Sequence, residues 1–284
     1  MSTQQECVEL ANGVQMPVIG YGTWQIPVNE RFLSTIHTAI QLGYRHFDTA
    51  QIYQNADLLG EAVRFSGFPR KDFFLSCKIW ATCRSYETAY EAVCETYDRM
   101  KVGAIDLICV HWPTTQGDPM LWQSANAGVW RALEDAQLEG KVRAIGVANF
   151  LPHHLVPLLA RARIRPAVNQ LEIHPGHTQF STVNWCLKQG IQVQAWSPLG
   201  RGALLTNPTV LAIARAHNVA PAQVLLRWSI ERQLCPIVKA VDLIHMRENL
   251  RLYHFELSDE EISALDKLPP STAYSGLHPD TVTF

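Results

Sequence analysis

Long apolar runs and an excess of either charge are both missing from this sequence. Its 284 residues include 24 Lys and Arg and 26 Asp and Glu, so the formal net charge is −2. No uninterrupted apolar segment reaches the roughly 20 residues that a membrane-spanning helix needs. A nearly neutral chain also lacks the basic field that attracts nucleic acid or anionic lipid. The composition therefore predicts a protein that binds neither nucleic acid nor a membrane.

An export signal and paired cysteines are absent as well. Residues 1–6 contain neither the basic stretch nor the apolar stretch of a secretory signal. The 7 cysteines are scattered along the chain, and no two are spaced C-x-x-C. This pattern is typical of reduced thiols in the core of a cytosolic protein, so we expect a cytoplasmic location.

The common short motifs of cofactor and metal sites are not found either. No G-x-G-x-x-G follows a candidate strand, which excludes the usual dinucleotide fingerprint, and the G-x-x-x-x-G-K-[ST] phosphate loop is missing. The sequence has no His-Glu-x-x-His, no G-x-S-x-G and no clustered metal ligands. We therefore expect no metal site.

The sequence does contain a regular alternation of strand-like and helix-like segments. Candidate strands begin near Val18, Tyr44, Phe73, Ile105, Val142, Pro166, Gln192 and Pro236. Segments with helical periodicity lie between them, at residues 30–42, 57–65, 87–100, 121–139 and 180–189. Eight strands joined by crossover helices favour parallel pairing, and their natural closure is a (β/α)₈ TIM barrel. A doubly wound open sheet is the alternative.

Both ends of the chain add to this core. An Asn12-Gly13 turn between short apolar runs predicts an N-terminal β-hairpin. Near the other end, Pro221 opens one extra helix, and Ser258 begins a capping box ahead of another. Linkers are absent, so residues 1–284 are predicted to form a single domain. The segment from Pro269 onward either frays or folds back over the barrel mouth.

Three apolar strands end in three different ionisable groups. Asp48 closes one and is followed by Tyr53 in a turn, Lys78 closes the next, and His111 closes the third. Because strand ends of a barrel converge on one face, we expect these side chains to meet. Further polar and aromatic residues share this face: Thr23, Trp24, Trp80, Trp112, Asn149, Gln170, Glu172, Trp196, Ser197 and Lys239.

Taken singly, each of these residues has an ordinary structural explanation, such as a helix cap, a solvated charge or core packing. Their joint occurrence predicts a site for proton transfer to a carbonyl oxygen. Tyr53 is the proton donor, the Lys78 ammonium lowers its pKa, and Asp48 anchors the lysine. His111 donates a hydrogen bond to the substrate oxygen. None of these groups is a redox centre, so the electrons must come from a cofactor, and Trp196 offers a flat face for its ring.

The sequence resembles the aldo-keto reductases over nearly its whole length, including bacterial members such as the diketogluconate reductases. The motifs that carry the resemblance are residues 43–50 with Tyr53 and Gly60, 77–80, 106–107 with 111–113, 169–170 with 174–175, 196–200 and 236–239. The resemblance implies a (β/α)₈ barrel that binds NADPH, a small-molecule carbonyl substrate, and the tetrad Asp48, Tyr53, Lys78 and His111. It places at the cofactor Thr23, Trp24, Asn149, Gln170, Trp196, Ser197, Leu199, Gly200, Lys239, His245, Glu248 and Asn249.

Some positions depart from the family pattern. Ala148 stands where a serine is common, and Ala240 stands after the phosphate-binding Lys239 where Ser or Thr is usual. His245 replaces an arginine that faces the adenosine 2′-phosphate, and Arg247 follows two positions later. Neutral histidine lacks the permanent charge and the planar fork of arginine. We therefore expect NADPH to be used with weakened discrimination against NADH.

The resulting hypothesis is a monomeric NAD(P)H-dependent oxidoreductase that reduces aldehydes or ketones to alcohols. One rival is a cofactor-sensing or interaction subunit on the same barrel. Another is a lyase that uses Lys78 as a Schiff base. Trp24, Trp80 and Trp112 predict an aromatic-walled substrate pocket, suited to apolar aldehydes or to keto-sugar acids. Substrate choice is expected to depend on residues 114–120, residues 201–208 and the C-terminal segment.

Overall fold

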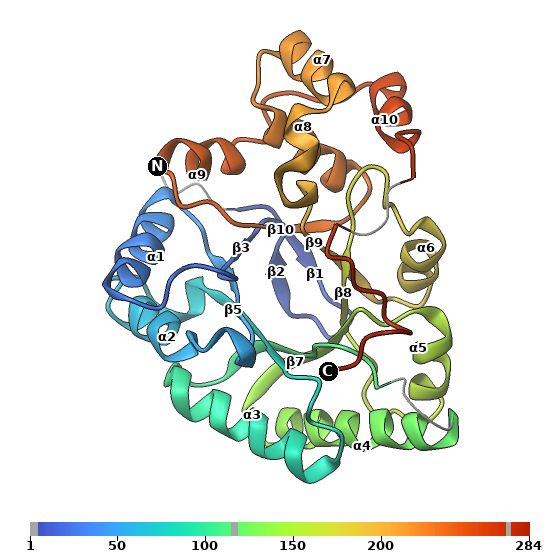
Figure 1. The fold of residues 1–284 in the computed structure, drawn as a ribbon. Coiled ribbons are helices and arrows are strands. Elements are labelled where there is room, and N and C mark those ends of the chain that lie inside the picture. Colours follow the sequence, from blue (N-terminus) through green and yellow to red (C-terminus); the bar gives the residue numbers. More distant parts are fainter. Residues whose placement is uncertain (1–4, 115–118, 271–273) are drawn as a thin grey trace.

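Eight parallel strands close into a barrel at the centre of the molecule (Figure 1). The structure is a computed structural model that describes residues 5–114, 119–270 and 274–284. Around the barrel the strands follow the order β10-β3-β4-β5-β6-β7-β8-β9. Their bounds are β3 (Gly20–Gly22), β4 (His46–Asp48), β5 (Phe74–Ile79), β6 (Ile105–Val110), β7 (Val142–Ala148), β8 (Val168–Glu172), β9 (Gln192–Trp196) and β10 (Cys235–Val238).

Helices surround this barrel as an outer ring (Figure 1). They are α1 (Glu30–Leu42), α2 (Ala56–Arg64), α3 (Tyr86–Met100), α4 (Pro119–Leu138), α5 (Pro152–Leu159), α6 (Phe180–Lys188), α7 (Pro208–His217), α8 (Pro221–Glu231), α9 (Leu243–Leu250) and α10 (Asp259–Asp266). Short 3₁₀ turns lie at η1 (Gln51–Tyr53), η2 (Arg70–Asp72) and η3 (Gly200–Thr206). The predicted TIM barrel is confirmed, and the closed ring of strands excludes the open doubly wound sheet.

Local sequence signals explain where several helices begin and end. The Asn29 side chain accepts a hydrogen bond from the amide of Arg31 at the start of α1, and Gly43 ends that helix in a left-handed conformation with φ 112°. Ser258 and Glu261 form the predicted capping box of α10. These signals place the two ends of α1 and the start of α10.

The expected strand starts lie within two residues of the observed ones, but three helices were not predicted. Helix α5 carries an internal proline, Pro157, which interrupts the helical signal. Helix α9 has only 8 residues, with Met246 and Asn249 buried. Helix α7 follows the 3₁₀ segment η3, in which Arg201 and Gly202 have left-handed conformations that are typical of a loop.

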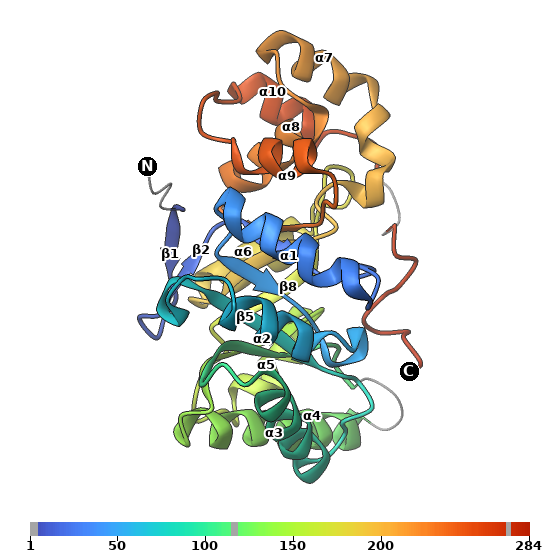
Figure 2. The same ribbon diagram turned by 90° about the vertical axis from the view of Figure 1, so that its left-hand side faces the viewer.

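The predicted N-terminal hairpin is confirmed as an antiparallel pair, β1 (Cys7–Glu9) and β2 (Gln15–Pro17). It lies across the amino-terminal end of the barrel, opposite the C-terminal segment (Figure 2). Leu10, Val14 and Met16 pack there against inward-facing strand residues such as Phe74 and Leu107. The hairpin therefore closes the bottom of the barrel with apolar side chains and leaves the carboxyl ends of the strands to form the site.

The C-terminal segment folds back over the open mouth of the barrel. The amide of Ser275 donates a hydrogen bond to Glu172 Oε1 at 3.2 Å. The Phe284 ring packs on Trp80 and Trp112, with centroid distances of 4.9 and 5.6 Å. Of the two alternatives that the sequence left open, the structure shows folding back for residues 274–284. Within the described ranges, no helix is both long and apolar enough to cross a bilayer.

Close contact between α2 and α3 requires a glycine at position 60. A Cβ on Gly60 would lie 2.0 Å from the Met100 carbonyl oxygen. We expect Gly60→Ala to lower the free energy of unfolding by about 1–3 kcal/mol or more, because one of the two helices must move. Urea denaturation measures this change.

Gly128→Ala in α4 is the matched control. A Cβ at Gly128 would meet the Tyr86 amide at an ordinary 3.6 Å. Since alanine favours a helix over glycine by about 1 kcal/mol, this variant should be neutral or more stable. Equal destabilisation of the two variants would contradict the close-contact explanation.

Candidate active site

A buried ion pair joins the neighbouring strands β4 and β5. Lys78 Nζ lies 2.6 Å from Asp48 Oδ2 and donates a second hydrogen bond to the Thr49 carbonyl at 2.8 Å. The Lys78 side chain is 2% exposed and that of Asp48 is 6% exposed. In the register of β4 and β5, Asp48 lies opposite Ser76, and Lys78 follows two residues later on the same face of β5, so the sheet itself brings Asp48 and Lys78 together. The expected pairing of Asp48 with Lys78 is present in the structure.

Tyr53 and His111 complete the predicted tetrad around this pair. Tyr53 ends the 3₁₀ turn η1, and its ring centroid lies 5.5 Å from Lys78 Nζ. His111 follows β6, with its ring 6.1 Å from that of Tyr53. The buried Nδ1 atom of His111 has no hydrogen-bond partner among the described residues. Both Tyr53 and His111 line the cavity above the ion pair, so their side chains can meet a ligand there.

The ionisation of these groups follows from their burial. Burial alone would lower the pKa of Lys78, but the charge of Asp48, the neighbouring Tyr53 and the hydrogen bond to Asp48 together outweigh burial, and the pKa is raised. Burial and the nearby Lys78 charge lower the pKa of His111 well below its usual range. Burial raises the pKa of Tyr53 to about 12, while Lys78 opposes the rise. The net direction for Tyr53 is opposite to the one expected from the sequence, because burial outweighs the ammonium.

One cavity of about 990 Å³ at the barrel mouth gathers the predicted site residues. All but four of them line it: Trp24, Asp48, Tyr53, Trp80, His111, Trp112, Asn149, Gln170, Trp196, Ser197, Leu199, Lys239, His245, Glu248 and Asn249. The exceptions are Thr23, Lys78, Glu172 and Gly200. Lys78 lies directly beneath the cavity in its ion pair. Thr23 is fully buried, and its hydroxyl donates to the Asp48 carbonyl at 3.0 Å.

The amide side chains near the tetrad are held in fixed orientations. Gln170 Nε2 donates to Asp48 Oδ1 at 3.1 Å and to Gln194 Oε1 at 2.9 Å. Asn149 Nδ2 donates to the His111 carbonyl at 2.9 Å, and its Oδ1 accepts from Trp196 Nε1 at 2.9 Å. Asn149 has a left-handed φ of 64°, a conformation that asparagine tolerates well. Because the Gln170 nitrogen bonds Asp48 and Gln194, the Gln170 amide oxygen points away from both of them.

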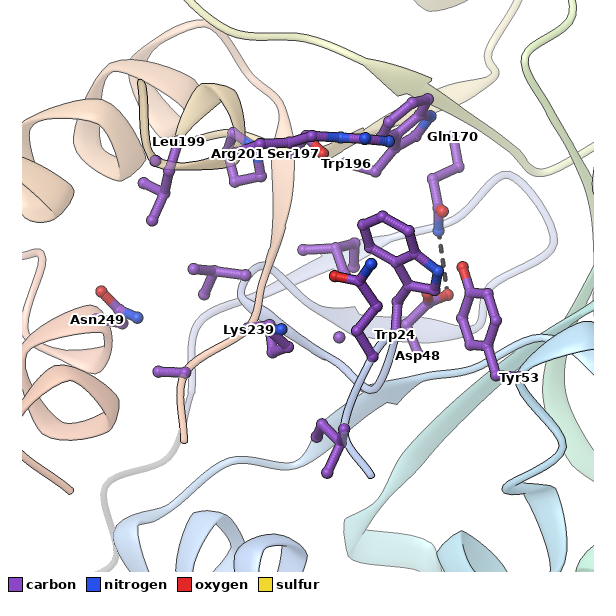
Figure 3. A pocket seen from close by; sticks show the side chains of 18 of the residues that line it. Trp24, Asp48, Tyr53, Gln170, Trp196, Ser197, Leu199, Arg201, Lys239 and Asn249 are labelled. Carbon is purple, nitrogen blue, oxygen red and sulfur yellow. Dashed lines mark hydrogen bonds between the residues drawn. The ribbon is translucent and has the colours of Figure 1, made fainter. Parts of the chain in front are cut away.

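The cavity is elongated, and its two ends differ in chemistry. Asp48, Tyr53 and Gln170 lie at one end and Lys239 with Asn249 at the other, with Trp196 and Ser197 between them (Figure 3). The Oδ1 atom of Asn249 is buried and has no hydrogen-bond partner within the described ranges.

The side of the cavity opposite Trp196 is formed in part by Trp24. The Arg201 guanidinium lies 4.9 Å from the ring centroid of Trp24, a cation–π contact across the cavity.

Sequence reasoning missed two groups of residues. The first is the aromatic wall that Phe284 forms with Trp80 and Trp112, since nothing local shows where residues 274–284 fold. The second is a polar layer beneath Asp48, made by His46, Ser76 and Gln194. Ser76 precedes Lys78 by two residues and therefore shares its face of β5, which is the signal that could have found it. Of the loops expected to select substrates, residues 115–118 lie outside the described part of the chain.

One group of possible metal ligands occurs among the described residues, away from the cavity. His153 Nε2 and His154 Nε2 lie 2.8 and 2.9 Å from Asp280 Oδ1. The Leu151 amide donates to His154 Nδ1 at 3.0 Å, so the imidazole proton is on Nε2, the atom that faces Asp280. We therefore interpret the group as a hydrogen-bonded contact that holds the C-terminal segment on α5.

The arrangement defines a class of chemistry. A neutral tyrosine next to a buried ammonium, at the carboxyl end of a barrel, can protonate an oxygen but supplies no electrons. The cavity of about 990 Å³ continues from the tetrad to Lys239 and Asn249, which leaves room for a second ligand beside the carbonyl compound. Fold and site together define an oxidoreductase that reduces carbonyl groups.

Comparison with known proteins agrees with this class. The Aldo/keto reductase family matches residues 18–269, and the chain belongs to this family. The chain is 38% identical over 280 residues to a glyoxal reductase from Bacillus subtilis (strain 168), covering 99% of this chain and 98% of the relative.

Two solved structures extend the comparison. An aldo/keto reductase from Brucella melitensis superposes with a TM-score of 0.87 at 35% identity, covering 94% of this chain and 98% of that chain. A Bombyx mori aldo-keto reductase in complex with NADP superposes with a TM-score of 0.84 at 29% identity, covering 93% of both chains.

The buried ion pair should be essential for stability. We expect Lys78→Met to lower the free energy of unfolding by about 3–5 kcal/mol, because it leaves the Asp48 carboxylate buried without its counter-ion. Chemical denaturation followed by circular dichroism checks this.

Arg99→Met is the matched control, since Arg99 pairs with Asp57 at 3.4 Å on the surface. An exposed pair of this kind contributes about 0–1 kcal/mol. A cost for Lys78→Met as small as that of the control would show that the buried pair is dispensable for folding.

Proposed function

We propose that the protein reduces small aldehydes and ketones with NADPH, with Tyr53 as the proton donor. The observation that carries the proposal is the Asp48–Lys78 ion pair next to Tyr53 and His111 at the closed end of an elongated cavity. A sensing or interaction subunit would not require a buried charge pair beside a tyrosine that faces the cavity. The Schiff-base alternative is disfavoured because the Lys78 pKa is raised, which keeps the amine protonated.

The residues of the cavity fit an extended nicotinamide cofactor. Trp196 lines it near the tetrad and can stack on an aromatic ring, while the oxygen of Gln170 faces away from Asp48 and can accept from a carboxamide. At the other end, Lys239 can pair with a phosphate, and the unpartnered Oδ1 of Asn249 can accept from an exocyclic amine.

The reaction is a hydride transfer coupled to a proton transfer. NADPH, when bound, supplies the hydride to the carbonyl carbon. The Tyr53 hydroxyl holds the proton that goes to the carbonyl oxygen, and the raised pKa keeps it protonated at neutral pH. His111 is neutral at this pH, because its pKa is lowered, and can donate a hydrogen bond to the oxygen as charge develops. Lys78 stabilises the tyrosinate that remains.

The walls beside the tetrad favour carbonyl compounds with an apolar body. Trp80, Trp112 and Phe284 pack together there, and they remove the reacting oxygen from bulk water. We therefore propose aromatic and aliphatic aldehydes, including small dicarbonyls of the kind that the glyoxal reductase name indicates, ahead of keto-sugar acids.

A single chain supplies the whole tetrad and the lining of the cavity, so we propose that the protein acts as a monomer. All seven cysteines, which lie in the described part of the chain, are free thiols, and this supports the proposed cytoplasmic location.

Tyr53→Phe tests the role of the proton donor. We expect kcat for carbonyl reduction to fall by about 10²–10⁴-fold, because the general acid is removed. NADPH affinity, measured by quenching of tryptophan fluorescence, should be unchanged. Tyr90→Phe is the matched control, since the Tyr90 hydroxyl bonds Glu139 on the surface of α3. A Tyr53→Phe enzyme that keeps more than about a tenth of wild-type kcat would refute the assignment.

His245→Arg tests cofactor discrimination. His245 lines the phosphate end of the cavity but is largely exposed and has no permanent charge. We expect the wild type to use both cofactors and the variant to gain about tenfold in kcat/KM with NADPH, since a charge-assisted hydrogen bond to the 2′-phosphate is added.

NADH, which lacks that phosphate, is the internal control and should be used equally by both enzymes. A wild-type preference for NADPH above about a thousandfold, or about 4 kcal/mol, would contradict the weakened discrimination.

A further inference from the structure

A layer of buried polar side chains lies inside the barrel, directly beneath the tetrad. His46 on β4, Ser76 on β5 and Gln194 on β9 are each at most 1% exposed. None of them lines the cavity, so none can contact a ligand there. Polar groups in a barrel interior cost free energy unless they are hydrogen-bonded. The hydrogen bonds of these three side chains therefore indicate the role of the layer.

Each hydrogen bond of this layer has a defined donor and acceptor, and the series of bonds starts at the N-terminal hairpin. His46 Nδ1 lies 3.0 Å from the Pro17 carbonyl, which can only accept, so Nδ1 carries the proton. Burial lowers the pKa of His46, which leaves Nε2 unprotonated and able to accept from Gln194 Nε2 at 3.4 Å. Gln194 is thereby oriented with Oε1 toward Gln170, whose Nε2 donates to it at 2.9 Å.

The layer ends on one oxygen of the catalytic carboxylate. Asp48 Oδ1 accepts from Ser76 Oγ at 2.8 Å and from Gln170 Nε2 at 3.1 Å. Its other oxygen, Oδ2, accepts from Lys78 Nζ at 2.6 Å. Residues of β5 and β8 donate to Oδ1, and Lys78 of β5 donates to Oδ2. These hydrogen bonds fix the orientation of the carboxylate, and the carboxylate in turn fixes the position of Lys78.

We propose that Ser76 is a positioning residue for carbonyl reduction: its hydroxyl, supported by Gln170 and Gln194, locks Asp48 so that Lys78 stays fixed beside Tyr53. This inference rests on the proposed function, because it assigns Ser76 a role in the proton transfer by Tyr53. Ser76 contacts neither substrate nor cofactor and acts through Asp48 alone.

Loss of the hydroxyl should change the acidity of Tyr53. The ionisable groups that face Tyr53 are Asp48 on β4, Cys77 and Lys78 on β5, and His111 after β6. Lys78 lowers the Tyr53 pKa and Asp48 raises it. Without the Ser76 hydroxyl the carboxylate loses a donor that offsets its charge, and Lys78, which this carboxylate holds beside Tyr53, can move away from the tyrosine. Both changes raise the Tyr53 pKa, so tyrosinate forms only at higher pH.

The experiment compares pH profiles of Ser76→Ala and the wild type in both reaction directions. Alcohol oxidation needs tyrosinate, so its rate rises with pH below the Tyr53 pKa, and in Ser76→Ala this rising part of the profile should move to higher pH by about 0.5–1 pH unit. Carbonyl reduction at pH 7 should lose up to about tenfold in kcat, because a pKa higher by about 0.5–1 unit makes Tyr53 a weaker acid by about 3–10-fold. NADPH affinity should be unchanged. Ser76→Thr, which keeps the hydroxyl, should restore the wild-type profile.

Two further variants separate positioning from packing. Ser229→Ala is the matched control, because Ser229 is fully buried and its hydroxyl donates to the Leu225 carbonyl within α8, away from the site. It should leave both profiles unchanged. Gln194→Met removes the partner behind Gln170 at similar volume, and it should shift the oxidation profile in the same direction by a smaller amount.

The outcomes are distinct. A lower kcat in Ser76→Ala with an unshifted pH profile would show a merely structural role and overturn the inference, as would a profile shifted to lower pH. If the wild type consumed no NADPH with any aldehyde or ketone, the proposed function would fail, and the role of Ser76 with it. An active wild type with unaltered kinetics in Ser76→Ala would overturn the inference alone.

Discussion

The ion pair between Asp48 and Lys78 is the interaction on which the rest of this structure depends. Two charges in the interior of a barrel carry a large desolvation cost, which only close pairing and further hydrogen bonds can offset. Here the two side chains are 2.6 Å apart, and they form further hydrogen bonds with Thr49, Ser76 and Gln170. The barrel provides these contacts because parallel strands in register bring residues distant in sequence to one level. The fold thus stabilises a charge arrangement that no single loop could hold.

The same pair connects the bottom of the barrel with its catalytic mouth. From the hairpin carbonyl of Pro17, hydrogen bonds run through His46, Gln194 and Gln170 to Asp48. Each donor in this series has its direction set by the preceding acceptor. The hairpin, which packs as an apolar plug, therefore also fixes the orientation of polar groups that reach the site.

Much of the fold and the centre of the site could be predicted from the sequence, for identifiable reasons. Strands ending in Asp48, Lys78 and His111 stand out because an ionisable group is unexpected after an apolar run, and parallel strands end on one face. Ser76 did not stand out, because a serine inside a strand carries no such contrast. The position of Phe284 and the net pKa of Tyr53 depend on tertiary packing and burial, which no local pattern contains.

This contrast follows from how the two parts of the site are built. Strand ends are fixed by hydrogen bonds of the sheet, so their side chains meet wherever the strand pattern is recognised. The walls around them come from loops and from residues 274–284, whose position depends on a few side-chain contacts such as those of Asp280 with His153 and His154. A sheet tolerates little change at Asp48 or Lys78, whereas a loop can change without disturbing the barrel. The strand residues therefore determine the chemistry, and the loops and residues 274–284 determine which carbonyl compound binds.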